Sequence, residues 1–325
     1  MLNYVIRRVG YAVLILIGVN IFTFMLFFTV NTPDDMARMN IGGKRVTQDA
    51  IEKWKVERGY DKPLFWNGAA PGTEKVTKTI FFERSVQLFA FDFGASDSGR
   101  DIGYELRTRV GPSLALAVPT FVLGIVVVIV FSLLLVFFRN TYLEFWGFTV
   151  AVFMMAISAL FYILLGQFLF SRVLKLVLIS GFAGGWDLFV FLALPVLIGI
   201  VSRLGSEALF YRTMFLEEIG KDYVRTARAK GVTERGVVRH HAFPNALVPI
   251  LTLAGLAYAE LLAGTVLTET IFSWPGLGRY TYQSALAIDF PAIMGVTFLV
   301  ALMYLGINLL VDIAYLFVDP RVARR

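Results

Sequence analysis

The sequence predicts an all-α membrane protein with about six transmembrane helices. Hydrophobic residues make up 57% of the 325 residues and charged residues only 17%, whereas a soluble domain is roughly 45–50% apolar and about 25% charged. In addition, several uncharged runs reach the roughly 20 residues that a helix needs to cross a bilayer. Soluble core helices do not produce such runs, so lipid is the expected solvent for most of the chain.

Six apolar runs mark the expected spans. Four of them contain no charged residue: 9–33, 111–138, 145–171 and 290–311. A fifth run, 242–268, is interrupted only by Glu260, and a sixth, 188–202, is shorter and ends at Arg203. The Gly-rich stretch within 172–187 is expected to form an interfacial or re-entrant turn rather than another span.

The distribution of basic residues predicts that both termini lie in the cytoplasm. Lys and Arg concentrate in short loops on that side of a membrane. Arg7 and Arg8 lie near the start of the chain, three arginines lie near its end, and eight lysines and arginines lie within 203–241. Six spans place all three segments inside. A seven-span alternative would place the two ends on opposite sides.

Three regions are expected: an N-terminal region with the first span (1–33), an external region (34–110), and a five-helix core (111–325) that contains a cytoplasmic loop at 217–244. In the external region, Ile51 and Trp54 share one helix face, and Gly59 is suited to end that helix. Five phenylalanines there are too apolar for a disordered tail: Phe81, Phe82, Phe89, Phe91 and Phe93. They are expected to pack on the outer helix ends or, alternatively, to meet an external partner.

The segment 221–236, KDYVRTARAKGVTERG, is unusually rich in basic and small residues. Helical spacing gives it a basic face formed by Lys221, Arg225 and Arg228. A second face has small side chains and is formed by Val224, Ala227 and Gly231. Small residues permit close approach, so a short helix here is suited to a groove of another protein. The alternative is a polybasic loop that fixes orientation or meets anionic lipid, but interleaved Asp222 and Glu234 favour the protein partner.

This segment resembles the coupling loop of inner-membrane permeases from binding-protein-dependent ABC importers, in the dipeptide/oligopeptide/nickel branch. The general pattern has Glu-Ala-Ala, a Gly four positions later and then a Pro. Ala227, Gly231 and Pro244 occupy the second Ala, the Gly and the Pro positions, and Arg225 replaces the Glu, as is usual in the peptide branch. Similar stretches occur along the whole chain: MLNYVIRR at 1–8, GYDKPL at 59–64, FDFG at 91–94, TIFSWPGLGR at 270–279 and DPR at 319–321. The chain departs from the family in lacking a Pro at 157–161 and the Arg-Asn that often follows the coupling region.

The resemblance implies the architecture of a type I ABC importer permease with a large external insertion after helix 1, in a bacterial or archaeal cytoplasmic (inner) membrane. It implies a second, similar permease chain, two ABC ATPase subunits that hold ATP and Mg²⁺, and an external solute-binding protein. The residues that it assigns to ATPase coupling are Asp222, Tyr223, Arg225, Thr226, Ala227, Arg228, Ala229, Lys230, Gly231 and Pro244. Peptides are the first expectation for the substrate, with nickel complexes or oligosaccharides as alternatives.

No catalytic site, metal site or bound cofactor is predicted for this chain, and no nucleic acid is expected as a partner. The phosphate-loop pattern GxxxxGK[ST] is absent from the sequence, so ATP hydrolysis by that chemistry belongs to a partner. His240 and His241 are adjacent and would point apart on a helix, which is poor geometry for sharing a metal. A secondary transporter is the competing function, but no inverted repeat is evident.

Two further features are candidates for the substrate path. Glu260 interrupts an apolar run, and charges within a membrane are functional by default; the alternative is a pairing role at a helix contact. The second feature is either a rigid external turn or a scoop into the path, with Arg279 and the aromatic residues Trp274 and Tyr280 at the outer interface. Its residues are Trp274, Pro275, Gly276, Gly278 and Arg279.

Overall fold

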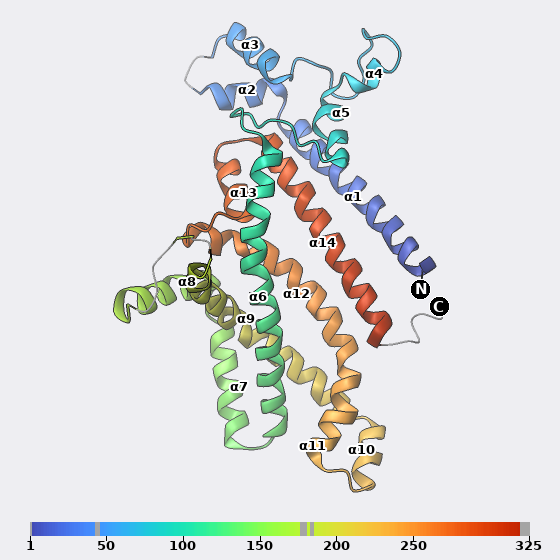
Figure 1. Cartoon of the computed structure of the whole chain (residues 1–325), viewed down its shortest axis with the longest axis vertical. Coiled ribbons are helices and arrows are strands. Elements are labelled where there is room, and N and C mark those ends of the chain that lie inside the picture. The colour runs from blue at the N-terminus through green and yellow to red at the C-terminus, as the bar shows by residue number, and fades with distance from the viewer. Residues whose placement is uncertain (1, 43–45, 176–180, 183–184, 319–325) are drawn as a thin grey trace. The chain divides into compact units, whose positions relative to one another are not determined.

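The computed structural model describes residues 2–42, 46–175, 181–182 and 185–318 (Figure 1). These residues are overwhelmingly helical and contain no strand, apart from one isolated bridge between Ala95 and Asp101. They divide into two compact units. We call Leu2–Gly111 with Gly276–Gly306 the insertion unit, and Pro112–Pro275 with residues 307–318 the core unit. The prediction of an all-α fold is confirmed.

Helices long and apolar enough to cross a membrane number four among the described residues: Tyr4–Val30, Ile102–Phe137, Asp187–Ile219 and Phe290–Ala314. They lie in α1 (Leu2–Val30), α6 (Ile102–Phe137), α9 (Asp187–Ile219) and α14 (Phe290–Val318). A bent pair would make a fifth span. In addition, α12 (Phe243–Ile271) is helical over the predicted run 242–268.

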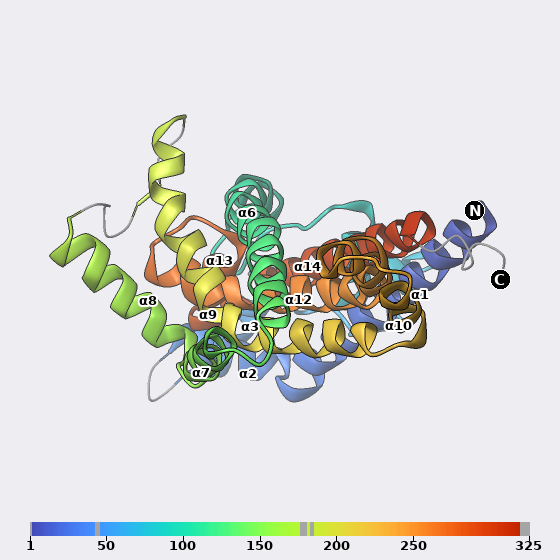
Figure 2. The same ribbon diagram turned by 90° about the horizontal axis from the view of Figure 1, so that it is seen from below.

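The bent pair covers the predicted run 145–171. Helix α7 (Tyr142–Met155) and α8 (Ala159–Gln167), which a π-helical stretch extends to Val173, meet at 96° across a short break. Figure 2 shows α7 end-on with α8 leaving it sideways. Ser158 begins α8 because its side chain accepts a hydrogen bond from the backbone N–H of Phe161. The expected turn within 172–187 lies partly outside the described residues.

After α1, the insertion unit continues directly into a second helix. Thr32 and Asp35 form a capping box that starts α2 (Pro33–Ile41), with Pro33 in the first helical turn. The chain continues through α3 (Gln48–Arg58), α4 (Glu74–Thr77), α5 (Ile80–Arg84) and a 3-10 turn at Val86–Ala90, and α13 (Leu277–Leu286) completes the unit. The predicted helix before Gly59 is confirmed, and Gly59 ends it in the left-handed conformation at φ 72°.

Aromatic side chains fill the core of the insertion unit. The ring of Phe81 lies 5.0 Å from that of Phe24 on α1, and Phe89 and Phe93 lie 5.1 and 6.4 Å from Phe298 on α14. Packing on the ends of the helices is therefore confirmed for these three residues. Phe91 differs, because 55% of its surface is exposed. Interactions of this kind between aromatic rings favour a single arrangement of the unit.

Close helix contacts hold the core unit together. Gly205 on α9 meets α7 so closely that a Cβ there would lie 2.4 Å from the carbonyl oxygen of Ala151. Ser132 on α6 donates to the carbonyl oxygen of Ala208 at 2.9 Å. Small residues and hydroxyl groups of this type are what bring helices together in lipid, where the hydrophobic effect between helices is weak.

Helix α9 extends beyond the apolar run 188–202 and continues for a total of 33 residues, to Ile219. The expected end of the span at Arg203, with a cytoplasmic segment following, stays a prediction. The charges beyond residue 202 are accommodated in pairs: Arg203 with Glu207, and Arg212 with Glu144 of α7. The C-terminal DPR motif and the terminal arginines lie outside the described residues.

Candidate coupling surface and central cavity

The corner between α9 and α10 (Asp222–Ala229) is fixed by one buried carboxylate. Glu218, in the last turn of α9, is only 8% exposed. It forms an ion pair with Lys221 and accepts a hydrogen bond from the hydroxyl of Tyr223 at 2.6 Å. Burial and then this hydrogen bond raise the pKa of Tyr223 to about 12, so the hydroxyl remains a donor at physiological pH. The orientation of α10 is thereby tied to the end of α9.

A hairpin of α10 and α11 (Glu234–Val237) follows. Val224 and Ala227 of α10 are buried against Val237. Gly231 makes the turn at φ 82°, and its N–H donates to the carbonyl oxygen of Arg228 at 2.9 Å. That Gly231 ends the short helix is confirmed.

The interpretation of the small face as the surface offered to a partner is wrong, because Val224 and Ala227 pack within the chain. The exposed face of α10 instead includes Asp222 and Arg225, whose side chains are 96% and 73% exposed. The remaining predicted coupling residues are also exposed: Tyr223, Thr226, Arg228, Ala229, Lys230, Gly231 and, at the start of α12, Pro244.

Three arginines border an open hollow of about 450 Å³ beside α10. Arg225 and Arg228 come from α10, and Arg139 comes from the turn after α6. Apolar side chains of α6 and α9, among them Phe137 and Ile219, form the remaining wall. The exposed surface of α10 is therefore adjacent to a basic hollow.

The turn after α12 is closely packed, which favours a rigid turn over a scoop into the substrate path. Trp274 is 1% exposed, donates from Nε1 to the carbonyl oxygen of Pro112 at 2.8 Å, and stacks edge-on with Phe182 at 5.0 Å. Ser273 before it has φ 55°. Trp274 and, in the insertion unit, Tyr280 are buried within the chain. Their expected place at the outer membrane interface stays a prediction.

A second acidic residue of α12 lies in the core unit and was not anticipated. Glu269 is fully buried, and Ser113 of α6 donates to it at 2.6 Å. The side chain of Glu260 lies outside those that the structure describes, so its predicted role in the path stays a prediction. Glu269 could have been noticed from the sequence only as an acidic residue at the end of an apolar run.

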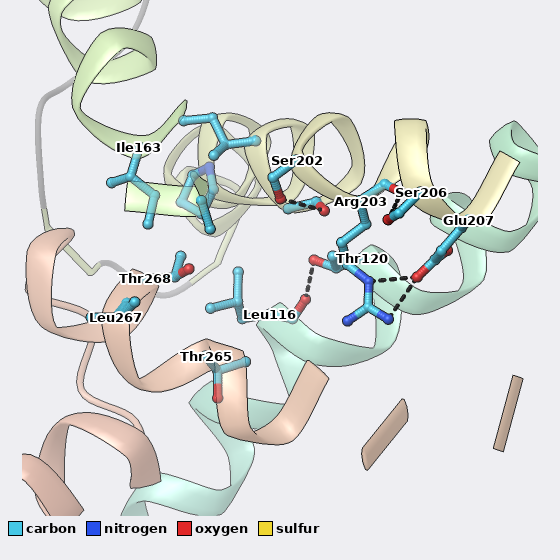
Figure 3. Close-up of a pocket in the computed structure, with 14 residues that line it drawn as sticks. Leu116, Thr120, Ile163, Ser202, Arg203, Ser206, Glu207, Thr265, Leu267 and Thr268 are labelled. Carbon is cyan, nitrogen blue, oxygen red and sulfur yellow. Dashed lines mark hydrogen bonds and ion pairs between the residues drawn. The ribbon is translucent and has the colours of Figure 1, made fainter. Parts of the chain in front are cut away.

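Figure 3 shows a cavity of about 290 Å³ within the core unit. Helices α6, α8, α9 and α12 contribute its walls, which combine apolar side chains such as Leu116, Ile163 and Leu267 with hydroxyl and charged groups. The polar residues that line it are Thr120, Ser202, Arg203, Ser206, Glu207, Thr265 and Thr268.

Arg203 and Glu207 are the charged residues among the described side chains that line this cavity. They extend from α9 toward α6, where Thr120 lies (Figure 3). Arg203 donates from Nε to Oε1 of Glu207 at 2.6 Å. A 33-residue helix is about 50 Å long, so its middle lies within the roughly 30 Å of hydrocarbon if the helix spans the bilayer. A charge there costs about 2.5–3.5 kcal/mol, far more than the roughly 0.3–0.5 kcal/mol of an exposed i,i+4 pair.

No group of three or more His, Asp or Glu side chains with metal-binding geometry occurs in the part of the chain that the structure describes. His240 is exposed within the π-helical stretch Val238–Ala242.

Comparison with known proteins decides the family. Residues 112–324 match the model of binding-protein-dependent transport system inner membrane components, and residues 1–85 match the N-terminal model of such membrane components. The chain belongs to this family of ABC importer permeases. The permease is 33% identical to the probable D,D-dipeptide transport system permease protein DdpB of Escherichia coli, over 96% of this chain and 95% of that protein.

Two other relatives are similar over nearly their whole length. The permease is 31% identical to a putative peptide transport system permease protein of Brucella suis, with 98% of each chain covered. It is 32% identical to the glutathione transport system permease protein GsiC of Shigella flexneri, with 99% of each covered. The predicted family, the peptide branch, the multi-pass character and the function as a transport permease are confirmed.

Proposed function

We propose that this permease imports short peptides and is driven by a separate ATPase that docks on the exposed face of α10. The observation that carries the proposal is the fixed corner at Glu218. This carboxylate binds both Lys221 and Tyr223 at the start of α10, so a displacement of α10 is passed to α9 rather than absorbed in a flexible linker. The apolar face of α10 is already covered by α11, which leaves its polar face for a partner.

In this proposal, the energy for transport comes from the ATPase, which binds α10 differently in its two conformational states. A nucleotide shifts a conformational equilibrium only by its differential affinity for the two states. Moving the equilibrium from 1:99 to 99:1 requires about 5.5 kcal/mol of such differential binding. Helix α9 connects the docking corner to the residues of the central cavity, so the same rigid element carries the movement to the path.

The complete transporter in this proposal contains a second, homologous permease chain, two ABC ATPase subunits and an external solute-binding protein. ATP and Mg²⁺ bind the ATPase subunits, and this chain holds no cofactor. The membrane is the cytoplasmic (inner) membrane of a bacterium or archaeon, with both termini of the permease on the cytoplasmic side. The family description as a binding-protein-dependent component supports the external partner.

Peptides are proposed as the substrates because the relatives are named for D,D-dipeptide, peptide and glutathione transport. Nickel complexes and oligosaccharides remain the alternatives. Uptake measurements in proteoliposomes that contain the whole transporter separate the three classes. Uptake of a labelled dipeptide or tripeptide is expected, and uptake of only a nickel complex or only an oligosaccharide would contradict the proposal.

Substitution of exposed residues on α10 tests the docking site. Thr226→Trp and Ala229→Trp add bulk to the exposed face without entering the hairpin, so we expect at least a tenfold loss of uptake with normal membrane insertion. Tyr142→Trp is the matched control, because Tyr142 is 86% exposed at the start of α7. Ala227→Trp is unsuitable, since it would disrupt the hairpin. Unchanged uptake in both α10 variants would contradict docking at this face.

A further inference from the structure

The central cavity has features that coupling does not explain. Arg203 lies at the middle of the 33-residue helix α9, and Thr120 lies at the middle of the 36-residue helix α6. Both residues line the same cavity. Helix α9 therefore places a positive and a negative side chain, Arg203 and Glu207, beside an open space that α6 also lines. Ionisable residues within a membrane-spanning helix mark substrate pathways by default.

Three hydroxyl groups of the cavity are arranged as acceptors. Thr120 donates to the carbonyl oxygen of Leu116 at 2.7 Å, Ser202 to that of Gly199 at 3.2 Å, and Ser206 to that of Arg203 at 3.2 Å. Because each of these hydroxyl protons is directed to the helix backbone, oxygen lone pairs remain to face the cavity. They can accept hydrogen bonds from an ammonium or amide group.

The size of the cavity limits what it can hold. Ligand pockets commonly enclose about 300–1,000 Å³, and this one encloses about 290 Å³. The space suits a very short peptide or one end of a longer one. Leu116, Ile163 and Leu267 form an apolar wall, which suits an apolar side chain of the peptide.

We infer that Arg203 and Glu207 form a transient binding station for the charged main-chain termini of the transported peptide. Arg203 takes the carboxylate, because its planar guanidinium can donate two parallel hydrogen bonds to the two oxygens. Glu207 takes the ammonium group. A zwitterion brings one charge of each sign, so each of the two side chains gains an opposite charge from the peptide. This inference rests on the proposed peptide substrate.

A charge swap separates a substrate station from a structural ion pair. The i,i+4 spacing allows Arg203→Glu with Glu207→Arg to retain the pair, and Glu N-terminal to a basic residue is the more favourable order on a helix. Wild-type uptake by the swapped transporter would overturn the inference, because the proposed carboxylate and ammonium sites would have exchanged places without effect. If the residues hold the substrate, the swap raises the KM for peptide at least tenfold, as Arg203→Gln does.

The experiment uses the complete transporter in proteoliposomes with saturating binding protein. The affinity of the binding protein for peptide is measured separately. The same binding protein is used with every permease variant, so a change in KM arises in the permease. The double variant R203Q/E207Q removes both charges and serves as the folding control for R203Q. Absence of peptide uptake by the unmodified transporter would reject the proposed function itself, whereas uptake that is insensitive to all three variants would reject only the station.

Photo-crosslinking supplies a readout that a structural role would not change. A p-benzoylphenylalanine at position 206 or 268, in separate variants, lies on the cavity wall. The same residue at position 210, which is 50% exposed on α9 and absent from the cavity lining, is the control. A labelled peptide is expected to be captured from the cavity positions during turnover, at least fivefold less in R203Q. If a cavity variant still transports but captures no more peptide than the variant at position 210, the inference is overturned. If neither cavity variant transports, the result of the charge swap decides.

Discussion

In the core unit, Glu207, Glu144 and Glu218 each pair with a cation, whereas in the insertion unit Asp97 and Asp289 are two carboxylates buried side by side. Asp97 and Asp289 are 8% and 6% exposed, and the N–H of Asp97 donates to Oδ1 of Asp289 at 3.2 Å. Burial beside a second carboxylate raises the pKa of Asp97. The comparison therefore predicts a pH-dependent stability for the insertion unit.

The largest effect is expected at the contact of α7 with α9 in the core unit. Gly205→Ala places a methyl group 2.4 Å from the carbonyl oxygen of Ala151 and 2.9 Å from the backbone nitrogen of Met155. Since backbone must move, we expect about 3 kcal/mol or more of destabilisation and little folded permease. The amount of monodisperse protein extracted in detergent measures this. Gly124→Ala, where the nearest atom lies at 3.8 Å, is the control, and equal yields from both variants would show that the contact is not tight.

The next effect concerns the corner that ties α10 to α9. Glu218→Leu removes the acceptor for Tyr223 and the partner of Lys221, and a buried hydrogen-bonded charge of this type contributes about 2–3 kcal/mol locally. We expect uptake to fall at least tenfold while ATP hydrolysis continues, because α10 no longer carries α9 with it. Glu217→Gln, an exposed neighbour, is the control. A Glu218→Leu transporter with normal uptake for each ATP hydrolysed would refute rigid coupling at this corner.

The smallest effect is confined to the insertion unit and depends on pH. Burial, followed by the charge of Asp289, raises the pKa of Asp97 from 3.8 to about 6. The folded unit therefore binds this proton more readily than the unfolded chain, so the contribution to stability is complete below about pH 4 and is lost as the pH rises through 6. Asp97→Asn should stabilise the unit at pH 8 by up to about 3 kcal/mol and have little effect at pH 4.

Thermal unfolding of the purified permease at pH 8 and at pH 4 measures this difference. Tyr60 donates to Oδ1 of Asp97 at 3.2 Å, and Arg58 donates to the backbone carbonyl of the same residue at 3.1 Å. Asparagine keeps an oxygen for the first of these bonds. Exposed Asp61→Asn is the control. An equal shift of the unfolding temperature at both pH values would show that folding does not raise the pKa of Asp97.

Local patterns predicted the parts of the permease that depend on short stretches of sequence. The helix ended by Gly59, the short helix ended by Gly231 and most of the apolar spans follow from spacing and capping alone. The length of α9 was not predicted, because Arg203 was treated as the end of the apolar span. The pairing of Arg203 with Glu207, four residues later, allows the helix to continue, and that spacing was present in the sequence but was not used.

The coupling surface and the cavity show more clearly what could not be predicted from the sequence. The small residues of α10 were expected to face a partner, but Val237, ten residues after Ala227, covers them. The contacts of Ser113 with Glu269 and of Asp97 with Asp289 join residues far apart in the chain. No periodicity encodes such pairs, so the sequence predicted the type of helix and its place but not the face it presents.

The account depends most on the exposed face of α10 being the site where the ATPase docks. The chain contains no cysteine, so Ala229→Cys introduces one thiol on that face. Labelling with a membrane-impermeant maleimide is measured in inside-out vesicles with and without the ATPase subunits, and Tyr142→Cys is the control. The account predicts that the ATPase slows labelling at position 229 at least tenfold and leaves position 142 unchanged. Labelling at position 229 that is equally fast with and without the ATPase would contradict it.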